Sequence, residues 1–174
     1  MKTKFKDLTI WITGASSGLG EALALAFAKK GATIILSGRN EDKLEAVKEQ
    51  CKKSRNHHIV PFDISDSEQT QAAYKSAINK AGKIDWLINN AGVSQRSLIM
   101  ETSEDAERQI MELDYFAQTR LTRLVLPAML EQGGGKIVMI SSIAGLIGTQ
   151  YRGAYSAAKA AIHLWANSLR AELY

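Results

Sequence analysis

The stretch Thr13-Gly14-Ala15-Ser16-Ser17-Gly18-Leu19-Gly20 lies between an apolar, β-branched run (residues 8–13) and a helical pattern (residues 18–30). Its glycines let the backbone turn sharply and come close to a pyrophosphate. The N-terminus of the following helix offers free N–H groups and a favourable dipole to the same anion. We therefore predict a phosphate-binding turn here, the alternative being a tight turn without a ligand.

Strand-like and helix-like stretches alternate along the rest of the chain. We expect Asn40 to cap one helix, Thr102 or Ser103 to cap a longer one, and Pro127 to interrupt that longer helix. Near-continuous apolar strands alternating with helices predict an α/β fold, a doubly wound parallel sheet in three layers. No linker or repeat divides the sequence, so residues 1–174 are expected to form a single domain. The further expected strands are 32–36, 58–62, 84–88 and 136–140, and the further expected helices are 41–53, 67–81, 103–131 and 154–174.

The composition is that of a globular protein, with 45% hydrophobic and 23% charged residues and only 2 prolines among 174 residues. The net charge of +4 comes from short basic stretches, such as Lys29–Lys30 and Lys52–Lys53, with acidic residues between them. Because no long basic cluster stands behind this surplus, we expect no nucleic-acid partner.

A single cysteine, Cys51, excludes an internal disulfide and favours a reducing compartment. The sequence has no run of about 20 apolar residues, and the run after its basic start is too short for a secretory signal. We therefore expect a soluble, cytoplasmic protein without membrane contact. The histidines, His57, His58 and His163, are not at metal-ligand spacing, and no metal is expected.

Three later motifs join the glycine turn. Asn89-Asn90-Ala91-Gly92 ends the fourth expected strand, Ser142 follows the fifth, and Tyr155-Ser-Ala-Ala-Lys159 begins 13 residues after Ser142. Together with the T-G-x-x-x-G-x-G pattern of residues 13–20, they resemble the short-chain dehydrogenase/reductase family over nearly the whole chain. The resemblance implies a Rossmann-like NAD(P)-binding fold and an oxidoreductase.

The last motif has a chemical rationale of its own. Tyr155 and Lys159 are four residues apart and so share one face of a helix. A phenol, with a pKa of about 10, is a poor acid or base at neutral pH unless a nearby cation stabilises its phenolate. Ser142 can hydrogen-bond the substrate oxygen, with Ser141 as the rival for that role. The resemblance implies that the cofactor is held by Gly14, Ser16, Ser17, Gly18, Leu19, Gly20, Asn90, Ala91, Gly92, Tyr155 and Lys159.

The end of the second expected strand indicates which cofactor is preferred. It reads Ser37-Gly38-Arg39, with no carboxylate for a ribose 2′-hydroxyl, and Arg39 can bind a 2′-phosphate. We therefore expect NADP(H), with NAD(H) possible; the alternative is an Arg39 that only begins a charged helix. The resemblance implies that Asp63 contacts the adenine, whereas Asp63, Ser65 or Asp66 could equally cap the next helix.

One position departs from the family, which has an asparagine where this chain has Asp114. The backbone carbonyl is kept, but the side-chain N–H donors are lost. A carboxylate near Lys159 would offset the field of that lysine at Tyr155. We therefore count Asp114 with the catalytic residues and expect alcohol oxidation to accelerate into alkaline pH. The alternative is a helix residue of no catalytic consequence.

These features predict an NADP-dependent enzyme that moves a hydride between NADP(H) and a carbonyl or secondary-alcohol substrate. The alternative is a non-catalytic NADP(H)-binding sensor of the same fold. The resemblance also implies two further strands and a substrate loop, so we expect the sequence to be truncated after its fifth strand and the following helix. It implies a homodimer or homotetramer through the long helix and the last helix.

Overall fold

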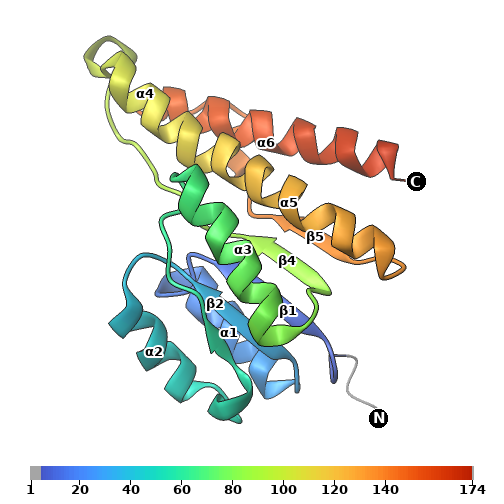
Figure 1. The fold of residues 1–174 in the computed structure, drawn as a ribbon. Coiled ribbons are helices and arrows are strands. Elements are labelled where there is room, and N and C mark those ends of the chain that lie inside the picture. The colour runs from blue at the N-terminus through green and yellow to red at the C-terminus, as the bar shows by residue number, and fades with distance from the viewer. Residues whose placement is uncertain (1–4, 174) are drawn as a thin grey trace.

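Five parallel strands form one sheet in the order β3-β2-β1-β4-β5 (Figure 1). The computed structural model describes residues 5–173. Trp11, at the centre of the sheet, pairs with Ile35 on one side and Leu87 on the other. The strands are β1 (Thr9–Thr13), β2 (Thr33–Ser37), β3 (His58–Ile59), β4 (Trp86–Asn89) and β5 (Lys136–Met139).

Helices cover both faces of this sheet. Alternate side chains of β1 explain why: Ile10 and Ile12 pack under the first two helices, whereas Trp11 packs under the third and fifth. All three side chains are fully buried. The three-layer α/β fold expected from the sequence is therefore confirmed. The helices are α1 (Gly18–Lys29), α2 (Glu41–Gln50), α3 (Ser67–Ala81), α4 (Glu104–Met111), α5 (Ala117–Glu131) and α6 (Gly153–Glu172).

Short helical turns complete the chain. They are the 3₁₀ turns η1 (Ser54–Asn56), η2 (Ile99–Glu101) and η4 (Ile143–Gly145), and the π-helical turn η3 (Glu112–Phe116). The expected last residue of α6, Tyr174, lies outside the described residues. Within residues 5–173 no helix combines the length and apolarity needed to cross a membrane.

Two elements are shorter than expected. The helix predicted over 41–53 ends at Gln50, and Lys53 takes a left-handed conformation, with φ 63°, before η1. The strand predicted over 58–62 keeps only its first two residues, and Pro61, which follows Val60, faces away from β2 at the edge of the sheet. The chain still follows β2, since Val60 N donates to Leu36 O at 2.9 Å and Phe62 N donates to Gly38 O at 3.0 Å.

The long helix is interrupted, but not where the sequence predicted. Pro127 lies inside the regular helix α5, so the expectation of a break at this proline is wrong. The irregularity is η3, between α4 and α5, where the wider π turn brings Asp114 into the interior. Ser103 caps α4, because its side chain accepts a hydrogen bond from Ala106 N at 3.2 Å.

Basic residues that are far apart in the sequence meet where the strands begin. Lys6, the pair Lys29–Lys30 and the pair Lys52–Lys53 line one groove of about 350 Å³. Lys29 and Lys30 end α1, where cations interact favourably with the helix dipole. The sequence shows these basic residues only as separate short stretches, so their grouping in one groove could not be predicted from it.

Candidate functional site

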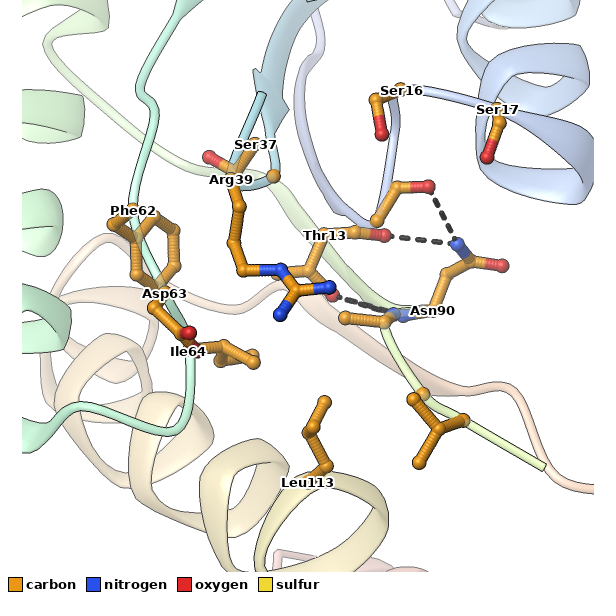
Figure 2. Close-up of a pocket in the computed structure, with 15 residues that line it drawn as sticks. Thr13, Ser16, Ser17, Ser37, Arg39, Phe62, Asp63, Ile64, Asn90 and Leu113 are labelled. Atoms are coloured by element: carbon orange, nitrogen blue, oxygen red, sulfur yellow. Dashed lines mark hydrogen bonds between the residues drawn. The ribbon is translucent and has the colours of Figure 1, made fainter. Parts of the chain in front are cut away.

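A pocket of about 320 Å³ lies at the carboxyl ends of the strands, beside β1 (Figure 2). The order of the sheet reverses at β1, which has β2 on one side and β4 on the other. Open parallel sheets bind ligands at such switch points. The lining residues are Thr13, Gly14, Ser16, Ser17, Ser37, Gly38, Arg39, Phe62, Asp63, Ile64, Asn90, Ala91, Gly92, Val93 and Leu113.

The glycine turn is held in place by the segment that follows β4. Asn90 donates through Nδ2 to Thr13 O at 3.0 Å and to Gly14 O at 3.1 Å. Thr13 Oγ1 accepts from Asn90 N at 3.0 Å and from Ala91 N at 3.1 Å. Figure 2 shows these bonds from Asn90 to the turn. One hydrogen-bonded unit therefore forms this side of the pocket.

The three glycines of the turn serve different purposes. Gly14 has φ +65°, and a Cβ there would lie 2.9 Å from Ala91 Cα, so both conformation and space require glycine. Gly20 is buried, and its Cβ would lie 2.2 Å from Gly14 O, so it lets α1 pack against the turn. Gly18 has φ +59° but faces open space. Only Gly14 of these three lines the pocket, and Leu19 points outward with 54% exposure.

Arg39 extends from the end of β2 into the middle of the pocket (Figure 2). It is exposed, and it takes part in none of the ion pairs formed within the described part of the chain. Asp63 follows the neighbouring strand β3, where hydrogen bonds from Ser65, and to a smaller extent the charge of Arg39, lower the pKa of its carboxyl group. The cap of α3 is Asp66, whose Oδ1 accepts from two backbone N–H groups, so Asp63 does not have that role.

A second cluster joins the last helix to the π turn. Lys159 Nζ lies 3.1 Å from Asp114 Oδ2 and donates to Ile140 O, at the end of β5, at 3.0 Å. It also lies 5.6 Å from the centroid of the Tyr155 ring. The structure therefore brings together Asp114, Tyr155 and Lys159, although 41 residues separate the first from the second.

Asp114 connects this cluster to the pocket. Its Oδ1 accepts from Val93 N at 2.8 Å, and a Cβ on Gly92 would lie 3.0 Å from the same oxygen. Gly92 and Val93 both line the pocket. Burial raises the pKa of the Asp114 carboxyl group above its usual value, while Lys159 and the Val93 N–H partly offset this effect.

The two serines after β5 differ in their hydrogen bonds. Ser141 donates its hydroxyl proton to Lys159 O at 3.1 Å, which ties this loop to α6. Ser142 Oγ instead accepts from Ala144 N at 3.2 Å and keeps its proton for another acceptor. The geometry therefore favours Ser142 over Ser141 as a donor to a bound molecule.

Three contributions were missed at the level of sequence. Thr13 was part of the quoted turn, but its bracing role needs β4 to lie beside β1. The Val93 N–H and the Ile140 carbonyl are backbone groups, and no side-chain pattern indicates them. The one signal that could have suggested them is position, since Val93 lies four residues after the end of β4 and Ile140 directly follows β5.

The family called short chain dehydrogenase matches residues 8–174. This chain belongs to the short-chain dehydrogenase/reductase family. The human protein called dehydrogenase/reductase SDR family member 7 is 42% identical over 172 residues, which are 96% of this chain and 51% of that protein. Member 7B of the family from Xenopus laevis is 39% identical over 93% of this chain and 52% of its own length. The chain thus spans about half the length of these curated relatives.

Two solved structures have the same fold over nearly the whole of this chain. L-Sorbose reductase from Gluconobacter frateurii, complexed with NADPH and L-sorbose, superposes with a TM-score of 0.93 at 32% identity, over 99% of this chain and 66% of that one. A short-chain dehydrogenase from Streptomyces avermitilis superposes with a TM-score of 0.91 at 34% identity, over 95% of this chain and 60% of that one. The names of these two solved proteins are those of a reductase and a dehydrogenase, and the reductase was solved with NADPH.

Proposed function

We propose that this chain carries the cofactor site and the proton-transfer groups of an NADP-dependent carbonyl reductase or alcohol dehydrogenase. The observation that carries the proposal is that two groups of residues lie side by side at the carboxyl ends of the strands. The phosphate-binding turn and Arg39 line a pocket there, and the Tyr155–Lys159–Asp114 cluster adjoins it through Gly92 and Val93.

The pocket fits NADP(H) by its own chemistry. The turn before α1 presents N–H groups to a pyrophosphate, and the open space at Gly18 leaves that approach free. Arg39 offers a planar, charge-assisted fork to a 2′-phosphate, with no acidic residue beside it at the end of β2. Asp63 and Ile64, which follow the neighbouring strand β3 and line the same pocket, would flank the adenine end. The nicotinamide supplies the hydride when NADPH is bound, or accepts it in the reverse direction when NADP⁺ is bound.

The residues of this chain handle the proton. Ser142 donates a hydrogen bond to the substrate oxygen and orients the reacting carbon. Tyr155 gives its hydroxyl proton to the oxygen of a carbonyl that is being reduced, or takes the proton from an alcohol that is being oxidised. Lys159 supplies positive charge near the Tyr155 ring, and Asp114 and Ile140 O fix its position.

A carbonyl substrate is also supported by a relative. L-Sorbose reductase was solved with NADPH and with a sugar that bears a ketone, and it shares this fold at 32% identity. We carry over to this chain only the cofactor and the type of reaction.

The test is NADPH consumption with a panel of ketones and aldehydes, using wild type, Tyr155→Phe and the matched control Tyr74→Phe on α3. Loss of the phenolic proton in Tyr155→Phe is expected to lower turnover by about a hundredfold or more, because general acid catalysis contributes that much. NADPH binding, followed by fluorescence, should survive both substitutions. Equal turnover by Tyr155→Phe and wild type would overturn the proposal. NADPH binding without turnover of any carbonyl would favour a sensor.

A further inference from the structure

Two loops meet beside Tyr155, at the start of α6. One is the segment 93–98 after β4, and the other is the segment 146–152 before α6. Ser97 N donates to Tyr151 O at 3.1 Å, and the Arg152 guanidinium donates to Ser94 Oγ. These contacts hold the two loops together as one rim.

Both loops bring an arginine to this rim. The Arg152 guanidinium carbon lies 5.5 Å from the centroid of the Tyr155 ring, on the turn just before it. The Arg96 guanidinium carbon lies 5.7 Å from the centroid of the Tyr151 ring, which directly precedes Arg152. Two guanidinium groups therefore lie against neighbouring aromatic rings, one of which is the proposed proton donor.

Neither arginine forms an ion pair within the part of the chain that the structure describes. Ion pairs between residues 5 and 173 include two other arginines, Arg108 with Glu104 and Arg120 with Glu112, but neither Arg96 nor Arg152. An arginine that lies against an aromatic face still presents its N–H edge to a planar anion. Each of these two arginines can therefore offer charged N–H donors to an anion.

We infer that the substrate of this enzyme is an anionic carbonyl compound, with its carboxylate held by Arg152 and supported by Arg96. This inference rests on the proposed function, because it places the anion beside the Tyr155 ring. Arg152 then determines specificity: it fixes the charged end of the substrate while the carbonyl faces Ser142 and Tyr155. A guanidinium and a carboxylate can form two parallel hydrogen bonds, which orient as well as attract.

A purely structural Arg152, which only ties the loops through Ser94, makes a different prediction. Its loss would impair charged and neutral substrates alike. The decisive comparison therefore uses pairs of substrates that differ only in charge. Suitable probes are 2-, 3-, 4- and 5-oxohexanoate, each beside its methyl ester, because this series varies the distance between carbonyl and carboxylate.

The first experiment measures kcat/KM for each pair with NADPH, in wild type, Arg152→Gln and Arg152→Lys. Wild type should prefer at least one acid over its ester. Arg152→Gln should lose about tenfold or more on that acid, as expected for a charge-assisted hydrogen bond, and stay within about twofold on the ester. Arg152→Lys should fall between them, since lysine keeps the charge without the fork. Arg55→Gln, on the exposed turn η1, removes the same charge far from the rim and should match wild type.

A second experiment does not depend on turnover. Titration calorimetry of the same acids and esters into the NADP⁺ complex measures binding directly. Binding of an acid, but not its ester, that is lost in Arg152→Gln supports the inference even if no oxo compound is reduced, in which case only the proposed function fails. If wild type binds and reduces each acid and its ester equally well, the inference about an anionic substrate is wrong. Turnover of both compounds would still support the proposed function. Equal losses on both in Arg152→Gln assign this arginine to loop structure.

Discussion

Lys159 Nζ and Asp114 Oδ2 lie 3.1 Å apart, with their side chains only 5% and 0% exposed. This pair joins α6 to the π turn η3, and the second oxygen of Asp114 continues to Val93 N. Removal of one partner from a buried ion pair leaves the other charge uncompensated, which is costly. The pair therefore couples the position of the proposed catalytic lysine to a residue of the cofactor pocket.

The Asp114→Asn variant should change the pH dependence of the reaction. An amide keeps the shape of the side chain but no longer offsets the positive charge of Lys159 near Tyr155. We expect the rise of alcohol-oxidation rate with pH to move to lower pH by about half a unit to one unit. The measurement is the pH–rate profile, with Asp105→Asn on the exposed side of α4 as the charge-matched control. A profile that coincides with that of wild type would remove the electrostatic role of Asp114.

The pH dependence of stability should distinguish Asp114 from Asp66. Burial raises the pKa of Asp114, so its contribution to stability is fully present below its usual pKa and is lost as pH rises through the raised value. Hydrogen bonds, above all from Gln69 N, lower the pKa of Asp66, so its contribution is present above its usual pKa and lost as pH falls through the lowered value.

Melting temperatures between pH 3 and about pH 7 measure this difference. With rising pH, wild type should lose stability relative to Asp114→Asn and gain stability relative to Asp66→Asn. Because both variants replace one carboxyl group by an amide, they are controls for each other. The same direction of change in both comparisons would contradict the assigned causes.

Two glycines of the turn should respond differently to alanine. Gly14→Ala meets both a left-handed backbone and a Cβ at 2.9 Å from Ala91 Cα, whereas Gly18→Ala meets only the left-handed backbone. The conformational cost alone is about 1–2 kcal/mol in each case. We expect the loss in free energy of unfolding to be larger for Gly14→Ala, as measured by urea denaturation. A smaller loss for Gly14→Ala than for Gly18→Ala would show that the turn relaxes around the extra methyl group.

Arg39 should decide between the two nicotinamide cofactors. Arg39→Gln removes the cation that we assign to the 2′-phosphate, so NADPH affinity should fall by about tenfold to a hundredfold. NADH lacks that phosphate, and its affinity should change by about twofold or less. Arg39→Lys should keep part of the preference because it keeps the charge. Fluorescence titration of all three proteins with both cofactors measures this, and equal losses for NADPH and NADH would assign Arg39 to the fold instead.

Most of the fold follows from local patterns in the sequence. The alternation of Ile10, Trp11 and Ile12 between two helical layers is a direct result of the period of a strand. The helix over residues 67–81 has the predicted bounds, and Asn40 caps α2 through a hydrogen bond from Lys43 N at 2.9 Å. These features depend on residues within one or two turns of each other, so the sequence determines them.

The π turn could not be predicted in this way. This turn buries Asp114, and the buried carboxylate is stabilised by Lys159 and by the N–H of Val93. Both partners come from distant parts of the chain, so no local pattern indicates the turn. The proline that attracted the prediction of a break, Pro127, lies inside α5 instead.

The candidate site divides along the same line. The motifs placed Tyr155 and Lys159 on one helix face and predicted a sharp turn at the glycines, where Gly14 has φ +65°. The motifs did not reveal that the side-chain amide of Asn90 donates two hydrogen bonds to the turn. They also did not reveal that Arg96 and Arg152 lie on two loops that contact each other. Such relations join loops from different strands, and they exist only once the sheet has formed.

The bonds between Asn90 and the glycine turn have a thermodynamic consequence. The loops after β1 and β4 are ordered against each other by the protein itself, so the entropy of fixing them is lost during folding rather than when a nucleotide arrives. An anion that enters this pocket meets donors already in place, and less of its binding free energy goes into ordering the loops. Under the proposed function, oxidised and reduced cofactor would exchange at each turnover without these two loops having to be ordered again.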